Sequence, residues 1–484
     1  MTDPANPGAR GAGRHFIEPG DHGDDEAHDA AEFARRLALR HAELLVTGGT
    51  VMTPGGAERI DLACAAGRIV ALGALAAGWR ADTTLDARGL HVLPGVVDTQ
   101  VHFREPGLTH KETIEAGTRG AVLGGVTAVF EMPNTQPLTL DAAALDAKLA
   151  RARGTAWCDH AFYLGGSAVN AERLAELERL PGCAGVKVFM GSSFGDLLAD
   201  EDAVLRRIVR HGRRRMAVHA EDEARLGERR ARVEASRDVR DHPRWRDPQS
   251  ALLATRRIVG LAAEAGRRLH LLHVSTAEEM AFLALHRRQV SVEVTPHHLT
   301  LVAPECYERL GSLAQMNPPV RDAHHREALW QALRDGVVDV IGSDHAPHTR
   351  AEKARPYPDS PSGMTGVQTL LPVMLDHLHH GRLSLPRLVD LTSAGPARLF
   401  GLAGKGRIAL GYDADLTLVD LAARRRIGDG WIASVAGWSP YDGMPCTGWP
   451  VATVLRGRPV VRDEALVGTP RGRPLRFHEA PPPA

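Results

Sequence analysis

Residues 96–105 read VVDTQVHFRE, and this stretch indicates the kind of strand from which the fold is built. Side chains of a β-strand alternate between its two faces, so every second residue from Asp98 to Arg104 lies on one side and every second residue from Val97 to Phe103 on the other. The first set is polar and the second is apolar. We therefore expect a buried strand whose apolar side meets a helix layer and whose polar side points inward.

Seven further short apolar stretches follow this one between about Pro94 and Ala397: TAVFEM, AFYLG, AGVKVFM, MAVHA, LHLLHV, VSVEV and VDVIGSD. Segments with helical spacing, such as DAAALDAKLARARG, separate them. Strands buried on both faces and alternating with helices predict an α/β fold with a parallel sheet. Eight such strands fit a closed TIM-like (β/α)8 barrel better than the alternative, an open doubly wound sheet, because no GxGxxG opens a helix here.

The ends of the chain have a different texture. Short β-type runs separated by turn signals precede the barrel and return after it, and they predict a small composite β-sandwich built from the N- and C-terminal segments. The predicted domains are a disordered leader (1–40), the sandwich (41–93 plus 398–470), the barrel (94–397) and a flexible tail (471–484).

Composition excludes several classes of protein. The 484 residues carry 59 basic and 59 acidic side chains, so no extended basic field is available for nucleic acid or an anionic membrane. The local cluster Arg213–Arg215 is interpreted as a solvated helix face. No apolar run is long enough for a membrane helix, and five cysteines without a CxxC pair favour a reducing cytoplasm.

Polar residues lie where several of the predicted strands end. The histidines are His102, His219 and His273, the carboxylate is Asp344, and Lys187 interrupts an apolar run. A single histidine at a strand end is more often structural, but five such groups at one end of a barrel form a ligand set for zinc or a similar divalent ion. Such an ion would polarise a carbonyl and lower the pKa of a bound water. The Lys187 ammonium needs carboxylate partners or conversion to a carbamate, because burying it unpaired costs several kcal/mol.

Seven strings occur in one order between residues 98 and 353: DTQVHFREPGLTHKET, EMPNT, GVKVFMG, HAEDE, LHVST, MNPPVR and SDHAPHTRAEK. On these strings the chain resembles the dihydroorotases of the cyclic amidohydrolase superfamily. REPG, MPNT, NPPVR and DHAPH favour dihydroorotase over the related hydantoinases and allantoinases. The resemblance implies reversible interconversion of N-carbamoyl-L-aspartate and dihydroorotate in de novo pyrimidine biosynthesis, and it fits the barrel with its composite sandwich.

The resemblance also assigns roles. It implies one or two zinc ions, with Lys187 carboxylated and bridging where two are bound, and it makes Asp344 both a ligand and the group that moves the proton. The implied metal ligands are His102, Lys187, His219, His273 and Asp344, and the implied substrate-binding residues are Arg104, Asn134, Asn317 and His348. A substrate with a carboxylate and a ureido group independently calls for an Arg fork and amide side chains. The alternatives are an ion pair of Arg104 with Glu105 and turn capping by the two asparagines.

One position departs from the family pattern. The first metal motif of the family is His-x-His, and this chain has Gln100-Val101-His102. Gln100 is therefore a doubtful ligand, and the site could hold one metal, hold two with altered preference, or be degraded. Because some dihydroorotase-like chains are inactive partners of aspartate carbamoyltransferase, a non-catalytic subunit is one alternative. A related cyclic amidase, acting on allantoin or a hydantoin, is the other. We expect a small-molecule substrate and a homo-oligomer.

The segment RAEKARPYPDSPSGMTGVQT, residues 350–369, predicts a long loop after the strand that carries Asp344. Long loops in compact domains are often lids over a site. The alternative is a static surface loop.

Overall fold

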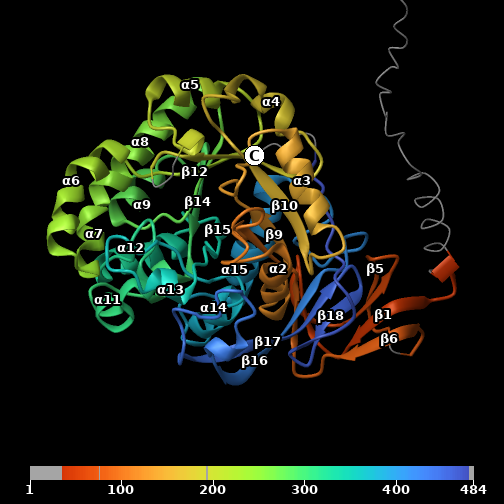
Figure 1. Ribbon diagram of the computed structural model, residues 1–484. Coiled ribbons are helices and arrows are strands. Elements are labelled where there is room, and N and C mark those ends of the chain that lie inside the picture. The colour runs from red at the N-terminus through yellow and green to blue at the C-terminus, as the bar shows by residue number, and fades with distance from the viewer. Residues whose placement is uncertain (1–34, 37, 76, 192–194, 479–484) are drawn as a thin grey trace, which may run out of the picture.

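A computed structural model describes residues 35–36, 38–75, 77–191 and 195–478, and its centre is a barrel of eight parallel strands (Figure 1). Neighbouring strands follow chain order, and the first and last meet through a parallel bridge between Val101 and His345. The barrel strands are β8 (Val96–Val101), β9 (Val126–Glu131), β10 (Asp159–Gly165), β11 (Cys183–Phe189), β12 (Met216–His219), β13 (Leu269–Leu271), β14 (Val290–Val294) and β15 (Val340–Ile341). The predicted (β/α)8 fold class is confirmed.

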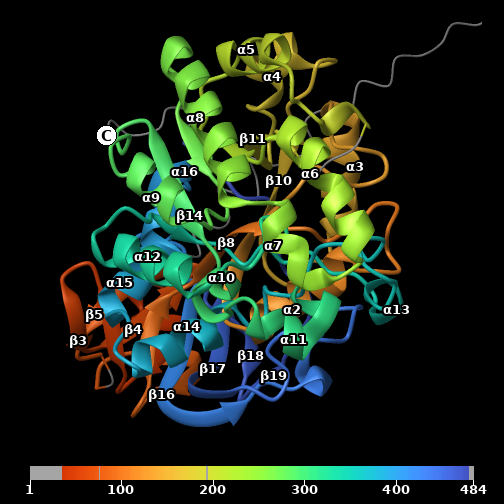
Figure 2. The same cartoon turned by 90° about the vertical axis from the view of Figure 1, so that its left-hand side faces the viewer.

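Helices cover the outside of the barrel, and Figure 2 shows α6, α8, α9 and α12 on its outer surface. The helix α8 illustrates why these segments begin and end where they do. Asp247 accepts a hydrogen bond from the amide of Ser250, Pro248 occupies the first turn, and Gly266 ends the helix with φ of 66°. The described α-helices are α2 (Ile114–Leu123), α3 (Ala142–Ala152), α4 (Leu174–Leu177), α5 (Asp202–Arg210), α6 (Glu223–Ser236), α7 (His242–Trp245), α8 (Pro248–Ala265), α9 (Ala277–Leu283), α10 (Pro296–Thr300), α11 (Glu305–Leu310), α12 (Ala323–Arg334), α13 (Arg350–Lys353), α14 (Leu370–His379), α15 (Leu385–Val389) and α16 (Gly395–Phe400).

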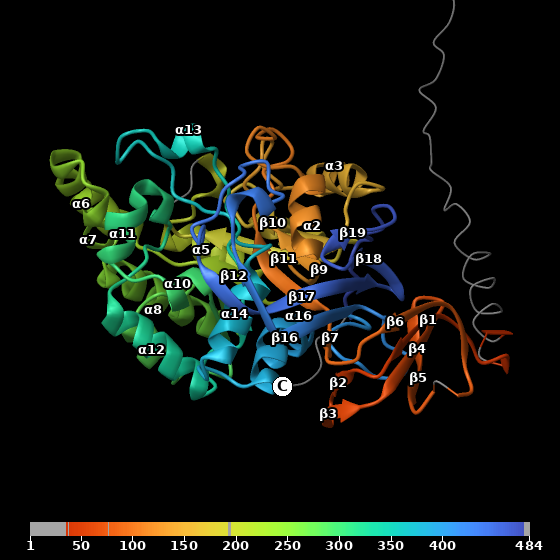
Figure 3. The ribbon, with the colours of Figure 1, turned by 90° about the horizontal axis from the view of Figure 1, so that it is seen from below.

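Two further sheets form the predicted composite β-sandwich beside the barrel (Figure 3). Apolar side chains of both sheets, such as Leu44 and Leu62 on one and Val92 and Leu416 on the other, pack in one core. The four-stranded sheet contains β1 (His41–Thr47), β4 (Asp61–Ala65), β5 (Arg68–Gly73) and β6 (Arg80–Asp86). The seven-stranded sheet contains β2 (Thr50–Thr53), β3 (Gly56–Arg59), β7 (His91–Pro94), β16 (Leu416–Arg426), β17 (Pro445–Leu455), β18 (Arg458–Arg462) and β19 (Ala465–Leu466). The antiparallel pairing of β7 with β16 joins the N- and C-terminal segments.

The structure describes part of the predicted C-terminal tail but little of the predicted N-terminal leader. Most of the predicted leader, residues 1–34 and 37, lies outside the described residues. Residues 471–478 belong to the predicted flexible tail, yet Leu475 is buried and its amide donates to the carbonyl of His160 on β10. The domain boundaries themselves stay predictions.

The cluster Arg213–Arg215 is not a helix face, so that interpretation is wrong. The helix α5 ends at Arg210, and the chain then turns at Gly212 with φ of 92°. Arg214 and Arg215 instead donate hydrogen bonds to the carbonyls of Cys183 and Leu269, where β11 and β13 begin. These hydrogen bonds link the segment before β12 to β11 and β13, its two neighbours, at the N-terminal end of the barrel.

In the described part of the chain, no helix is long and apolar enough to cross a membrane. The five cysteines are all buried free thiols, as expected of a chain without a disulfide framework.

Candidate active site

The ten side chains singled out from the sequence border one cavity of about 250 Å³. They come from distant parts of the chain and meet because the carboxyl ends of the barrel strands converge. The ten are Gln100, His102, Arg104, Asn134, Lys187, His219, His273, Asn317, Asp344 and His348. The cavity is also bordered by Pro361, Ser362 and Gly363 from the long loop after β15.

Three of these residues have a backbone conformation that L-amino acids rarely adopt. Arg104, His273 and Asp344 have φ of 61°, 40° and 47°. A left-handed conformation costs a non-glycine residue roughly 1–2 kcal/mol. Such strain concentrates at functional sites, where the surrounding structure enforces it. Each of the three lies just beyond the end of its strand, where the turn in the chain directs its side chain into the cavity.

Four of the proposed ligands lie in two close pairs. His102 Nε2 lies 3.2 Å from Asp344 Oδ1, and His219 Nδ1 lies 3.0 Å from His273 Nε2. Because His102 Nδ1 donates to Asn134 Oδ1, the Nε2 of a neutral His102 turns a lone pair toward Asp344. Burial lowers the pKa of all three imidazoles, which favours the neutral form that a metal ligand needs.

Glu221 fixes the orientation of His219, and the sequence reasoning gave it no role. His219 Nε2 donates to Glu221 Oε2 at 3.0 Å, so its Nδ1 turns a lone pair toward His273. Arg246 donates to both oxygens of Glu221 and keeps that buried carboxylate ionised. Burial alone would raise the pKa of Glu221, but the charge of Arg246 and the hydrogen bond from His219 hold it well below its usual range. A carboxylate behind a ligating histidine is a common feature of metal sites.

Lys187 is the buried lysine of the cavity. Its Nζ lies 4.3 Å from the ring centroid of Phe189, and the described residues give it no hydrogen bond or ion pair. Burial lowers its pKa to about 7, although the charges of Asp344 and Glu293 oppose this. Of the two outcomes foreseen for this side chain, direct pairing with a carboxylate is not found.

Gln100 contacts Asp344, the carboxylate that would also bind a metal in the family pattern. Its Nε2 donates to Asp344 Oδ1 at 3.0 Å, while its Oε1 is buried and has no hydrogen-bond partner. An unpaired buried oxygen is costly unless a cation or a water completes it. The amide oxygen is thus available as a neutral donor.

Arg104 presents its guanidinium to the cavity, and Lys111 makes this possible. Lys111 Nζ donates to His348 Nδ1 at 3.1 Å, so the remaining proton of the neutral imidazole is on Nε2. That Nε2 donates to the Ser362 carbonyl at 3.1 Å and cannot accept from Arg104, whose Nη2 is 3.4 Å away. In the described part of the chain Arg104 has no carboxylate partner, and its Nε donates to the Pro347 carbonyl at 3.3 Å.

The ion pair with Glu105, the alternative expected for Arg104, is not found among the described residues. Glu105 accepts a hydrogen bond from the amide of Ile114 and does not pair with Arg104. Asn134 Oδ1 accepts from His102 Nδ1 at 2.7 Å, and Asn317 Oδ1 accepts from His242 Nε2 at 3.1 Å. Both amides are held against histidines at the edge of the cavity.

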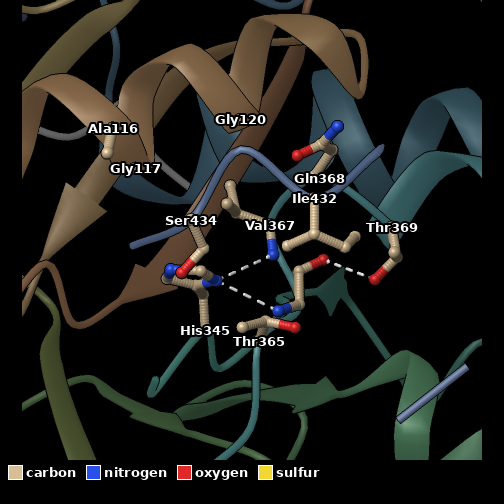
Figure 4. A pocket seen from close by; sticks show the side chains of 11 residues that line it. Ala116, Gly117, Gly120, His345, Thr365, Val367, Gln368, Thr369, Ile432 and Ser434 are labelled. Atoms are coloured by element: carbon tan, nitrogen blue, oxygen red, sulfur yellow. Dashed lines mark hydrogen bonds between the residues drawn. The ribbon is translucent and has the colours of Figure 1, made fainter. Parts of the chain in front are cut away.

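The residue after Asp344 points the other way. His345 lies beside α2, where its Nδ1 accepts from the amides of Gly366 and Val367 (Figure 4). Its Nε2 donates to Glu112 Oε2 at 3.1 Å. His345 thus connects β15 to the outer layer and does not reach the cavity.

Within the described ranges, no three His, Cys, Asp or Glu side chains already stand as a metal-binding group. The donor set nevertheless fits a metal in kind. The two close pairs, the unpaired amide oxygen of Gln100 and the amine of Lys187, which has no partner among the described residues, all face one cavity. A bound cation would give the lone pairs of these atoms a partner.

A model of the amidohydrolase family matches residues 91–460 of this chain. The chain belongs to the amidohydrolase family. This amidohydrolase is 39% identical over 382 residues to a dihydroorotase of Halobacterium salinarum, which covers 78% of this chain and 87% of the relative. It is also 39% identical over 453 residues to an allantoinase of Rubrobacter xylanophilus, which covers 90% of this chain and 97% of the relative.

Among solved structures, the fold of this amidohydrolase is similar to that of the L-hydantoinase (dihydropyrimidinase) from Arthrobacter aurescens, with a TM-score of 0.85 and 30% identity over 90% of this chain and 99% of that chain. The resemblance to dihydroorotases is confirmed. This amidohydrolase is a hydrolase acting on cyclic amides, and its family is generally metal-dependent.

Proposed function

We propose that this amidohydrolase is a dihydroorotase, which interconverts N-carbamoyl-L-aspartate and dihydroorotate in de novo pyrimidine biosynthesis. The observation that carries the proposal is the guanidinium of Arg104, which faces the catalytic cavity and pairs with no carboxylate of the described residues. Dihydroorotate brings a carboxylate on its ring, whereas allantoin and hydantoin do not. A buried guanidinium recognises such a group by two parallel hydrogen bonds.

The proposed metal is zinc, as one or two ions. His102, Lys187, His219, His273 and Asp344 would hold it, with Gln100 as a weak neutral donor. When bound, the metal polarises the amide carbonyl of the ring and activates water. Carboxylation of Lys187 is part of the proposal, because an amine with a pKa of about 7 is about half unprotonated at neutral pH and can add carbon dioxide.

Asp344 is the proposed proton carrier. Its Oδ1 accepts from Gln100 and faces His102 Nε2, so its other oxygen, Oδ2, is the one left to take a proton from the attacking water. Delivery of that proton to the ring nitrogen allows the amide bond to break. Asn134 and Asn317 would hold the ring amide, and the neutral His348 keeps the Arg104 fork open.

A ring without a carboxylate is the second candidate substrate, since the allantoinase relative matches as well in identity as the dihydroorotase relative. Arg104→Gln separates the two. If the substrate is dihydroorotate, its kcat/KM falls about 100-fold, since charge-assisted hydrogen bonds are worth roughly 1.5–3 kcal/mol, while that of hydantoin changes less than about threefold. The matched control is Arg288→Gln, at an exposed arginine whose side chain has no partner among the described residues. Equal loss for both substrates would contradict the carboxylate clamp.

We also propose that the protein is cytoplasmic and forms a homo-oligomer. Because Gln100 replaces a metal-binding histidine of the family pattern, the alternative is a non-catalytic subunit that associates with aspartate carbamoyltransferase. An active enzyme loses turnover in Asp344→Ala. A non-catalytic subunit would instead co-purify with the transcarbamoylase, whose activity Asp344→Ala would not change.

A further inference from the structure

A second cavity lies at the opposite end of the barrel from the catalytic one. Its volume is about 1180 Å³, several times that of the catalytic cavity. Its walls are the segments that precede β11, β12 and β13, together with residues 474–477 near the C-terminus. These segments lead into the amino ends of the strands, whereas the catalytic residues follow the carboxyl ends. Figures 1 and 2 show α4 and α5, which end at this cavity, next to each other.

Arginine dominates the lining of this second cavity. Five arginines of the lining have guanidinium groups with no hydrogen-bond or ion-pair partner in the part of the chain that is described. They are Arg179, Arg210, Arg213, Arg268 and Arg476. The single acidic residue of the lining, Glu178, is buried and already accepts hydrogen bonds from Arg267 and from the backbone amide of Arg214. The cavity therefore has a strong positive field that the described residues do not neutralise.

Two arginines of the lining are not exposed surface side chains, because Arg267 is buried and Arg214 is half-buried. Arg267 is 3% exposed, and its Nε has no hydrogen-bond partner. Arg214 lies over the ring of Phe477 at 4.7 Å, and burial lowers its pKa, with the like charge of Arg179 adding to this. Burying arginines close together costs desolvation and like-charge repulsion. Clustered arginines are a common feature of sites that bind phosphate groups.

The lining also offers apolar surface. Leu180, Pro181, Leu475 and Phe477 border the same cavity as the arginines. A concave site of this size with a charged wall and an apolar wall suits a small molecule with several phosphates and a flat ring, whereas a nucleic acid duplex or a membrane needs an extended face. We propose that this cavity, which the described residues form on the face of the barrel away from the catalytic site, binds a nucleoside triphosphate.

The test uses the full-length protein and calorimetric titration with ATP at matched ionic strength. Saturable binding is expected, and inorganic triphosphate should compete for it, because the arginines contact the phosphates. The triple variant Arg179→Ser/Arg210→Ser/Arg213→Ser should bind ATP at least about tenfold more weakly, since each lost charge-assisted hydrogen bond is worth roughly 1.5–3 kcal/mol.

The matched control removes the same charge elsewhere. Arg59→Ser/Arg288→Ser/Arg424→Ser changes three exposed arginines whose side chains have no partner in the described part of the chain. The affinity of this variant for ATP should stay within about twofold of wild type. Absence of saturable binding, or equal weakening in both variants, would overturn the proposal. Unchanged affinity in the first variant would also overturn it, because ATP would then be binding elsewhere, including at a metal in the catalytic cavity.

Discussion

At the scale of single residues, Gln100 decides what the metal site can hold. Its Nε2 donates to Asp344 Oδ1, the oxygen that His102 also contacts. Its own Oε1 is buried in the cavity and has no hydrogen-bond partner among the described residues. A neutral amide oxygen binds a divalent ion less tightly than an imidazole. One of two metal positions is therefore weakened by this side chain.

Gln100→His should raise the metal content of the protein. After dialysis against a weak chelator and zinc loading, elemental analysis should show up to one further ion per chain, because an imidazole replaces the amide beside Asp344. The control, Gln331→His, places the same change on the exposed face of α12. Identical stoichiometry in wild type and Gln100→His would remove this residue from the metal site.

Period-2 alternation and strand-end position follow from covalent geometry, and they predict Gln100, His102, Lys187, His219, His273 and Asp344 from the sequence. The roles of Arg104, Asn134, Asn317 and His348 come from the resemblance to dihydroorotases. The sequence could not predict that Lys111 sets the proton of His348 or that Glu221 orients His219. Those roles depend on distances between loops far apart in the chain. Nor could it predict the left-handed backbone of Asp344, which only the packed barrel end enforces.

At the scale of elements, the loop after β15 forms part of the cavity wall. Lys353, at the end of α13, is 1% exposed, and its Nζ donates to the carbonyls of Pro361 at 2.8 Å and Gln315 at 3.2 Å. These bonds fix Ser362 and Gly363, the loop residues next to His348. The loop was predicted from its prolines and glycines, but its anchor was not, since a lone lysine in a polar segment looks solvated. Whether the loop opens as a lid stays a prediction.

Lys353→Met keeps most of the packing and removes both hydrogen bonds. Backbone amides of residues 356–366 should exchange hydrogen about tenfold faster, because a lost hydrogen bond is worth roughly 1 kcal/mol or more. Mass spectrometry of the exchanged protein measures this, with α8 as the internal control. Unaltered exchange in the loop would show that Lys353 does not hold it.

At the scale of the whole molecule, one buried charge cluster joins the barrel to the sandwich. Lys405 Nζ lies 2.6 Å from Asp159 Oδ2, at the start of β10, and 3.1 Å from Asp413 Oδ2, just before β16. Arg456 and Asp415 complete the cluster. Burial alone would raise the pKa of Asp159, but the charges of Lys405 and Arg456 lower it to about 2. The strand and helix patterns of the sequence predicted a barrel and a β-sandwich. The contact between these two domains could not be predicted, because it depends on the three-dimensional structure.

Asp159→Asn should destabilise the protein by about 3 kcal/mol at pH 7, because it leaves buried cations underpaired. A carboxyl whose pKa is lowered by folding stabilises above its ordinary pKa near 4, and that contribution is lost as the pH falls toward 2. The difference from wild type in urea unfolding should thus be constant from pH 5 to 8 and shrink below pH 4. Asp463→Asn, at a side chain 94% exposed, is the control. A difference that grows on acidification would contradict the assigned charge state.

The central claim is that this amidohydrolase opens and closes the ring of dihydroorotate with its cavity residues. The most direct measurement is turnover of dihydroorotate by one zinc-loaded preparation whose metal content is determined at the same time. We predict ring opening that requires bound metal, exceeds turnover of allantoin and hydantoin, and is lost in Asp344→Ala. No turnover of dihydroorotate at full occupancy with zinc, cobalt or manganese would contradict the claim.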